Sequence, residues 1–455
     1  APDEDEEDAA AADDIFEDLK PGSENKKGGN KSPTRRRKIE IPENIERQTH
    51  VHDLPEDEKV CACCGKQMCR IGEEVTEKVD LIPARLVARQ DVYPKYACPD
   101  HNCDGKPKQA LRPNNPLGKI MATATILAFI ATQKYHFGVP LYRLEGFFKN
   151  LGVTISRCTM SLWMIKAAEA LRPIYEALEE RLLSEDYIHI DETGLQVLGE
   201  PGKPATSKSQ MWVRRSGRGP PIVLYHYSES RSADVAKQLL RGFTGYLQSD
   251  DYSGYTSVAK ASPNIEHLLC WDHSRRYFWD AYQALPRDKK KNSVAERALK
   301  IIKKLYKVEV KIKNQSDERR LKARAEESMV ILEKLKKLTD QHRPSLGDKT
   351  PTAKAIDYMN DNWEKLQVYL TKPFLNISNS PAEQAVRPFA LGRKAWLFSQ
   401  SPRGADASAI LYSLAVTAKE NGRDPNQYFI EALQGIAKAK TPEDLQKLLP
   451  LSTMG

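Results

Sequence analysis

A stretch of twelve residues, YIHIDETGLQVL (187–198), constrains the fold of this chain more than any other. Ile188 and Ile190 alternate with polar residues, which is the period of a β-strand, and the apolar residues that follow indicate that the strand is buried. A carboxylate is costly to bury unless it is paired or binds a metal, so Asp191 is the first candidate functional residue. The alternative is that Asp191 ends the strand or accepts a hydrogen bond from a nearby backbone amide.

The segments after this strand predict an α/β fold. SQMWVRRSG (209–217) and PIVLYHYS (221–228) read as strands, residues 230–243 as a helix, and GYLQSDDYSGY (245–255) and IEHLLCWDH (265–273) as two more strands. Three strands, a helix and a fourth strand are the order of a ribonuclease-H-like sheet, which we expect over residues 186–283. Asp250 follows apolar residues at a strand end, where it would lie beside Asp191.

Charge is distributed unevenly along the chain. Residues 1–19 contain ten Asp or Glu and no basic residue, so the net charge of +8 leaves +18 for the remainder. This basic excess favours nucleic acid as a partner, and a merely solvated basic surface is the alternative. Residues 1–45 are rich in charge, Gly, Pro and Ser, which predicts a disordered charged tail. Its basic part, residues 31–38, either lies along DNA phosphates or is a solvated tether.

The length and hydropathy of the chain narrow its class. At 455 residues the chain exceeds one hydrophobic core, and roughly three domains are expected. No apolar run reaches the ~18 residues that a membrane-spanning helix needs, and no signal peptide is visible. We therefore expect a cytoplasmic protein without a membrane partner.

Six of the eight cysteines lie between residues 61 and 103. In a chain without an export signal, such clustering favours zinc over disulfides. CACCGK places Cys61 and Cys64 in a Cys-x-x-Cys knuckle, and ACPDHNC supplies a second ligand pair, Cys98 with either Cys103 or His101. Four such ligands complete a structural zinc site. Residues 46–110 are therefore predicted to form a zinc ribbon.

Residues 111–185 have a helical pattern. One helix ends at HFGVP, a second runs through LYRLEGFFKNLG, and Ser156 is a good N-cap for a third helix that ends at Leu183. A long helix after a short helix and a Gly turn is the layout of a helix-turn-helix DNA reader. Ordinary helical packing is the alternative.

The remaining segments are also predicted to be largely helical. Apolar residues at helical spacing over 301–312 and 331–338 predict two helices within a helical insertion, residues 284–370. Their many Lys and Arg are either a DNA-contacting face or solvated surface. The sheet-containing core resumes over residues 371–420, and residues 421–455 read as a C-terminal helical segment.

Three acidic residues form the candidate catalytic set: Asp191, Asp250 and Glu383. Carboxylates from separate elements can hold two divalent ions ~3.5–4 Å apart, one for the attacking oxygen and one for the leaving oxygen. Mg²⁺, or Mn²⁺, suits such ligands. Glu383 has an alternative role, because Ser380 as N-cap with Glu383 at the third helical position is a capping-box pattern.

Basic residues near these acids are candidates for contact with DNA phosphates, because catalysis on DNA requires that phosphate be bound close to the metal. The candidates follow Glu383 in SPAEQ or lie just after CWDH: Arg387, Arg393, Lys394, Arg275 and Arg276.

The ordered set of motifs resembles the insertion-sequence-sixty-six family of bacterial DDE transposases. The matching stretches are VHDLPEDEKVCACCG, IGEEVTEKVDLIPARLVARQDVYPKYAC, VPLYRLEGFFKNLGVTISRCTM, IHIDETGLQVL, GYLQSDDYSGY, CWDHSRRYF and NSPAEQAVRPFALGRKAWLFS. The resemblance implies a zinc-binding region, a helical DNA-binding region and a ribonuclease-H-like catalytic core with a helical insertion between the second and third acids.

The resemblance also implies roles for single residues. Asp191, Asp250 and Glu383 fall on the catalytic triad of the family, and Cys270 with His273 matches its Cys-x-x-His pair. We interpret that pair as structural, because two ligands alone make a poor metal site. The sequence departs from the family pattern at three positions: His101 stands where Cys is commoner, Asp251 where Gly is usual, and Gln384 where Arg is commoner.

The activity implied by the resemblance is binding of terminal inverted repeats, followed by metal-dependent DNA cleavage and strand transfer. Double-stranded DNA, a second copy of the chain and accessory proteins of the same element are the implied partners, and the location is the bacterial nucleoid. One alternative is an inactive or domesticated relative that only binds DNA. Another is a junction resolvase or nuclease that cuts without joining.

Overall fold

The structure is a computed structural model that describes residues 42–43, 47–50, 52–59, 63, 66–76, 85–96, 106, 108–110, 117–118 and 120–452. The chain divides into two compact units, residues 1–86 and 87–455. Almost all of the predicted tail lies outside the described residues. The predicted zinc ligands do so as well: Cys61, Cys64, Cys98 and Cys103, with the alternative ligand His101.

Only short elements occur in the described part of the range predicted as a zinc ribbon. Glu56–Lys59 forms the 3-10 helix η2 in the first unit. In the second unit, β1 (Lys95–Tyr96) pairs antiparallel with β2 (Lys108–Gln109).

Three helices follow where the sequence predicts them. α2 (Ala124–Tyr135) ends before HFGVP, and α3 (Leu141–Asn150) begins after Pro140. α4 (Arg157–Leu183) has Ser156 as its N-cap, and the hydroxyl of that serine accepts a hydrogen bond of 3.1 Å from the backbone N–H of the third helical residue. The predicted helices are thus confirmed, while their contact with DNA stays a prediction.

This helical region is packed into the second unit. α2 lies against α16 (Pro425–Ile436), and α4 lies against α15 (Pro402–Glu420), which itself packs on the sheet. The short α17 (Pro442–Lys447) ends the described helices, as the prediction of a C-terminal helical segment requires. Among the described residues, no helix is both long and apolar enough to cross a membrane.

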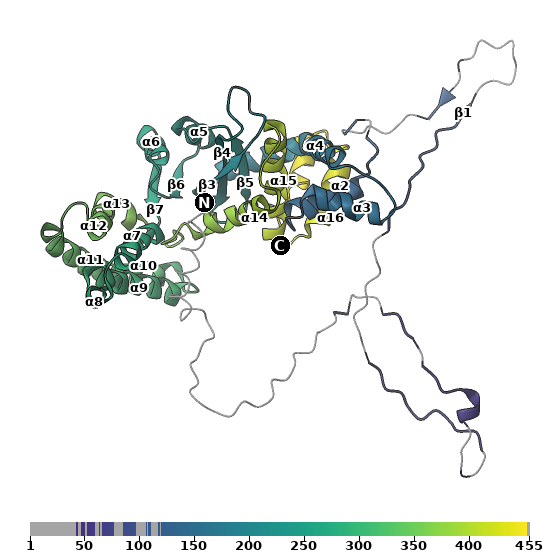
Figure 1. Ribbon diagram of the computed structural model, residues 1–455, viewed down its shortest axis with the longest axis horizontal. Helices are drawn as coiled ribbons and strands as arrows, with labels where there is room; N and C mark the ends of the chain where they lie inside the picture. The colour runs from purple at the N-terminus through teal and green to yellow at the C-terminus, as the bar shows by residue number, and fades with distance from the viewer. Residues whose placement is uncertain are drawn as a thin grey trace. The chain divides into compact units, whose positions relative to one another are not determined.

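A five-stranded mixed sheet lies at the centre of the second unit (Figure 1). Its strands lie in the order β5-β4-β3-β6-β7. β4 pairs antiparallel with both β3 and β5, whereas β6 pairs parallel with both β3 and β7. All five predicted strands are confirmed: β3 (Tyr187–Gln196), β4 (Lys208–Ser216), β5 (Val223–Ser228), β6 (Gly245–Ser249) and β7 (Ile265–Leu269).

Two of these strands are shorter than predicted. β6 stops at Ser249, and the rest of GYLQSDDYSGY enters α6 (Ser253–Ala261). β7 stops at Leu269, and CWDH enters α7 (Trp271–Gln283). Two parallel strands can be joined only by a crossover connection, so a helix begins soon after the last paired residue of β6. The predicted helix over 230–243 is also shorter, as α5 (Ala233–Leu239).

Helices cover both faces of the sheet. Successive residues of a strand point to opposite faces, yet every residue of β3 from Tyr187 to Ile190 is buried. α14 (Ser380–Trp396) packs on β3 and β4, and α15 packs on β5. β3 is therefore the central strand of the core, as its apolar content predicts.

Residues 284–370 form the predicted helical insertion, drawn in green in Figure 1. Its apolar residues, among them Ile302 and Leu335, share one core with Leu268 and Trp271 at the end of the sheet. The elements of the insertion are α8 (Arg287–Lys290), α9 (Val294–Ile312), α10 (Asp317–Ala323), η3 (Arg324–Ser328), α11 (Met329–His342), η4 (Arg343–Ser345), α12 (Pro351–Asp361), α13 (Trp363–Gln367) and η5 (Val368–Leu370).

One buried arginine fastens this insertion to the segment that leads into α14. The guanidinium of Arg324 is fully buried and donates two hydrogen bonds, of 2.9 and 2.7 Å, to the carboxylate of Glu309. It also donates to the backbone carbonyls of Tyr369, Lys372 and Leu375. Removing the guanidinium leaves a carboxylate and three carbonyls without these partners.

Replacement of Arg324 by Met should therefore lower the free energy of unfolding by about 3–5 kcal/mol, the cost of breaking a buried ion pair on one side. Denaturant titration followed by circular dichroism measures the change. The control is Lys322→Met, because the Lys322 side chain is 71% exposed and its removal should change stability by less than about 0.5 kcal/mol. Equal free energies of unfolding for the two variants would contradict this role.

Candidate active site

The register of the sheet brings Asp191 and Asp250 together. β3 and β6 pair in parallel, with His189 opposite Gln248. Two residues further along each strand lie Asp191 and Asp250, on the same face and at the same level. Neighbouring strands are about 4.8 Å apart, so the two carboxylates leave the sheet side by side. The predicted juxtaposition follows from this register.

Glu383 reaches the same place through the start of α14. The N-cap of α14 is Asn379, whose side-chain amide donates to the carbonyl of Ile190 at 3.0 Å. Its amide oxygen accepts a hydrogen bond of 2.9 Å from Nδ1 of His189. Because Asn379 is held beside the residue that precedes Asp191, Glu383, one helical turn later, lies close enough to Asp191 for its charge to raise the pKa of that carboxyl.

The capping-box alternative for Glu383 is wrong. The helix begins one residue earlier than that pattern requires, at Ser380, with Asn379 rather than Ser380 as N-cap. The N-cap makes no side-chain capping hydrogen bond, because its amide is used on β3 and its oxygen on His189. Glu383 is left available for other chemistry.

Asp191 interacts electrostatically with both of the other acids. Burial raises the pKa of Asp191 well above the ordinary value of 3.8, and the neighbouring charges of Glu192, Asp250 and Glu383 raise it further. Burial also raises the pKa of Glu383, and the charge of Asp272 adds to this. Like charges held this close destabilise the ionised forms unless a cation is present.

Asp250 and its neighbour Asp251 point to different partners. Asp250 accepts a hydrogen bond of 3.1 Å from the backbone N–H of Tyr252, and its carboxylate lies 4.0 Å from the guanidinium of Arg231. Asp251 accepts a hydrogen bond of 2.8 Å from Asn362 of the helical insertion. Of these two aspartates, Asp250 is the one among the charges that raise the pKa of Asp191. The structure thus distinguishes two aspartates that are adjacent in the sequence.

Sequence reasoning missed the residues that support the cluster. Arg231 donates to a carboxylate oxygen of Glu192 at 2.6 Å, and the hydroxyl of Tyr255 donates to the other oxygen. Asp272 accepts hydrogen bonds from the hydroxyls of Tyr306, in the insertion, and Ser378. Arg231, Tyr255, Asp272, Tyr306 and Ser378 lie in five different segments, and no local pattern marks them.

The predicted phosphate contacts fall into three groups. Arg275, Arg276 and Arg387 lie close enough to Glu383 to lower its pKa, which opposes the effect of burial. Arg393 instead donates to the hydroxyl of Thr193 at 3.0 Å and to the carbonyl of Gly194, so it joins α14 to β3. The side chain of Lys394 is exposed.

The residue types fit a hard divalent cation. Carboxylate oxygens are the ligands that Mg²⁺ and Mn²⁺ prefer, and the charges of Asp250 and Glu383 both act on Asp191. The raised pKa of Asp191 comes first from burial and then from the negative charge of nearby carboxylates, and a bound cation would offset both effects. Asp191, Asp250 and Glu383 are the residues that would hold such an ion.

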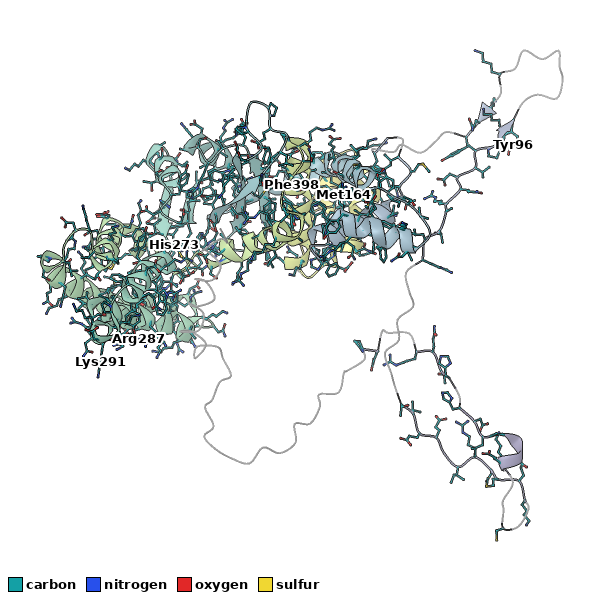
Figure 2. The ribbon with its side chains drawn as sticks, viewed as in Figure 1. Tyr96, Met164, His273, Arg287, Lys291 and Phe398 are labelled. Atoms are coloured by element: carbon teal, nitrogen blue, oxygen red, sulfur yellow. The ribbon has the colours of Figure 1, made fainter. Side chains whose placement is uncertain are left out.

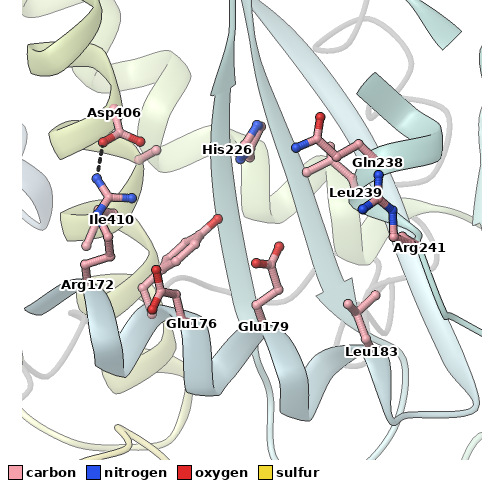
Figure 3. A pocket seen from close by; sticks show the side chains of 12 residues that line it. Arg172, Glu176, Glu179, Leu183, His226, Gln238, Leu239, Arg241, Asp406 and Ile410 are labelled. Atoms are coloured by element: carbon pink, nitrogen blue, oxygen red, sulfur yellow. Dashed lines mark hydrogen bonds and ion pairs between the residues drawn. The ribbon is translucent and has the colours of Figure 1, made fainter. Parts of the chain in front are cut away.

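A cavity of about 380 Å³ lies elsewhere, between α4, β5, α5 and α15 (Figure 3). Arg172 and Asp406 form an ion pair of 2.5 Å across one side of it. None of the three acids lines this cavity, so it does not belong to the carboxylate cluster.

Comparison with known proteins decides the family. Residues 119–407, more than half of the chain and including all three acids, match the Transposase IS66 family. The chain belongs to this family. Residues 58–100 match the zinc-finger binding domain of transposase IS66, a range that includes Cys61, Cys64 and Cys98 and ends before Cys103. Family membership assigns a transposase role, with DNA as substrate, and the zinc-finger match supports a structural zinc.

Relatives in Sinorhizobium fredii (strain NBRC 101917 / NGR234) match most of the chain. Uncharacterized protein y4jD is 30% identical over 423 residues, which cover 90% of this chain and 81% of the relative. Uncharacterized protein y4qI is 31% identical over 412 residues, 88% of this chain and 75% of the relative. The similarity therefore includes the sheet, the helical insertion and α14.

Binding of Mn²⁺ to the carboxylate cluster should weaken as the pH falls, beginning well above pH 3.8, because the raised pKa of Asp191 lets protons compete with the metal. Without metal, the same raised pKa makes the folded state lose stability as the pH rises above 3.8. Calorimetric Mn²⁺ titration at several pH values measures the effect. In Asp191→Asn, the Mn²⁺ affinity should depend less on pH. A Mn²⁺ affinity of the unmodified chain that stays constant down to about pH 4 would contradict this prediction.

Proposed function

We propose that the chain is a DDE transposase that binds the terminal inverted repeats of an insertion sequence and catalyses metal-dependent DNA cleavage and strand transfer. The observation that supports the proposal is that the charges of Asp250 and Glu383 both raise the pKa of Asp191. The three acids come from β3, the end of β6 and the first turn of α14, and they share one electrostatic environment.

The topology supports a ribonuclease-H-like core. Three antiparallel strands, with two further strands parallel to the first, follow the order expected for such a sheet. The first acid lies on the central strand and the second directly after the neighbouring strand. The third comes from a helix that packs across β3 and β4, after the helical insertion.

In this proposal the three carboxylates act only as ligands. When bound by them, a pair of Mg²⁺ or Mn²⁺ ions supplies activation of the attacking oxygen and stabilisation of the leaving oxygen. Asp191 and Asp250 lie on the sheet and offer oxygens from one side, and Glu383 offers them from α14. Arg231 and Tyr255 donate hydrogen bonds to Glu192, so the carboxylate next to Asp191 is held by partners of its own.

The reaction needs phosphate to be held near the carboxylates. Arg275, Arg276 and Arg387 supply positive charge beside Glu383, where a DNA strand would pass. In the first step water breaks a phosphodiester bond and leaves a 3′-hydroxyl at the element end. In the second step that hydroxyl attacks a phosphate of target DNA, and the displaced 3′-oxygen of the target leaves. Attacking and leaving groups are both oxygens in each step.

Two other regions of the chain are proposed to bind DNA and position it at the carboxylates. The zinc ribbon, with Cys61, Cys64, Cys98 and Cys103 or His101 as ligands, and the helices α2–α4 are proposed to bind the repeats. Two ends must be handled together, so the active form is proposed to be at least a dimer, with accessory proteins of the same element as possible further partners.

Replacing Asp191 by Asn should reduce cleavage and strand transfer by more than about 10²-fold, the scale of losing one preorganised electrostatic group. Binding of the repeat DNA should persist, because phosphate contacts come from other residues. The assay follows nicking and joining of labelled terminal-repeat DNA with Mg²⁺ or Mn²⁺. The matched control is Asp251→Asn, which should retain activity because Asp251 contacts the insertion instead.

Equal activity of the two variants would show that Asp191 is not a catalytic ligand. Stable DNA binding by the unmodified chain without any nicking would favour the inactive relative. Cleavage of branched DNA without joining would favour a resolvase.

Arg387 and Arg393, on the same helix, should behave differently when replaced by Ala. Loss of Arg387 should lower DNA affinity and reduce the slope of log affinity against log salt by about 0.9, the value for one phosphate contact. Loss of Arg393 should instead destabilise the fold by about 1–3 kcal/mol, because two β3 acceptors lose their donor. Fluorescence anisotropy at several salt concentrations and thermal unfolding measure the two effects. An unchanged salt slope in Arg387→Ala would exclude the phosphate contact.

A further inference from the structure

A second set of metal-binding side chains lies next to the carboxylates, at the start of α7. Cys270 is the N-cap of this helix and His273 lies in its first turn, so both side chains occupy the same helix end. One ligand atom from each, together with a carboxylate oxygen of Glu383, all lie within 4.8 Å of one another. The sequence shows only a Cys-x-x-His pair, and folding adds a third ligand from α14.

The surroundings of these side chains favour a bound cation. Nδ1 of His273 is buried and has no hydrogen-bond partner among the described residues. Buried polar atoms are rarely left in this state, and a metal would satisfy this one. Figure 2 shows His273 where the helical insertion meets the sheet-containing part of the second unit.

The thiol of Cys270 is placed to become a metal-bound thiolate. Its Sγ accepts a hydrogen bond of 3.0 Å from the backbone N–H of Asn379. It also lies at the N-terminus of a helix of 13 residues, where the helix dipole stabilises negative charge.

The chemistry of the three donors selects the metal. A thiolate, an imidazole and a carboxylate are a common ligand set for Zn²⁺, whereas Mg²⁺ requires oxygens. Zinc–ligand bonds of about 2.0–2.3 Å in tetrahedral geometry place donor atoms roughly 3.3–3.8 Å apart. Side-chain movements of about 1 Å therefore close the present arrangement around zinc, with a fourth position for water.

We propose that Cys270, His273 and Glu383 bind Zn²⁺, and that this ion competes with the divalent ions of the catalytic cluster for Glu383. The competition rests on the proposed function, because a glutamate turned toward zinc no longer completes the oxygen set with Asp191 and Asp250. Zinc bound here would keep the transposase inactive until it is removed.

Zinc content tests the site without any activity assay. The full chain is equilibrated with Zn²⁺, desalted and analysed for metal, together with Cys270→Ser, His273→Gln and the control Cys158→Ser, whose thiol is exposed on α4. Zinc in the ribbon is common to all four proteins. The unmodified chain and the control should each hold one zinc more than Cys270→Ser and His273→Gln, with unchanged circular dichroism. Equal zinc content in all four proteins would falsify the site.

Competition with Mn²⁺ tests the sharing of Glu383. Zinc should weaken Mn²⁺ binding, followed by electron paramagnetic resonance, by about 5- to 150-fold, and Mn²⁺ should weaken zinc binding at this site by the same factor. His273→Gln should remove this coupling while Mn²⁺ still binds. Independent binding of the two metals would overturn the competition.

Activity assays separate this proposal from the proposed function. If the unmodified chain cleaves DNA, added zinc should inhibit it, and His273→Gln should resist that inhibition. If the chain never cleaves DNA, the proposed function fails, yet the zinc content and the Mn²⁺ competition still decide whether the two sites share Glu383.

Discussion

The start of α14 is fixed to the central strand through one buried side chain, Asn379. Its amide donates to the carbonyl of Ile190, its oxygen accepts from His189, and its backbone N–H donates to the thiol of Cys270. Burial lowers the pKa of His189 to about 4, so the ring stays neutral and donates from Nδ1. Since unpaired buried polar groups are costly, these contacts fix one position for α14, and Glu383 is placed with it.

The fold keeps these carboxylates near one another although their negative charges repel. Asp191, Asp250 and Glu383 repel one another, and burial adds to the cost of ionising them. The sheet register, the Asn379 contacts and the insertion hold the three carboxylates in place despite that cost. Such strain is typical of metal sites, where the ion supplies the missing positive charge. If these three side chains act as proposed, stability and catalysis make opposite demands on them.

Two kinds of ligand meet at Glu383. On one side lie carboxylate oxygens, which suit hard divalent cations; on the other lie a thiol and an imidazole, which suit zinc. In our proposal, a single glutamate between them completes either set but not both at once. The insertion takes part in this arrangement, because Tyr306 holds Asp272 beside Cys270. A movement of the insertion would therefore displace Asp272, which lies beside the proposed zinc ligand Cys270.

The sequence by itself determined the five strands in chain order, the helices begun by Ser156 and ended at Leu183, and the three acids as candidates. Periodicity, caps and breakers are local, so they can be read without the fold. Only the tertiary structure decided that Glu383 caps no helix, that Asp251 accepts a hydrogen bond from the insertion and that Arg393 donates hydrogen bonds to β3. It also joined Glu383 to a Cys-x-x-His pair. These results depend on contacts between segments about 100 to 200 residues apart, which strand register and helix packing create and no local pattern encodes.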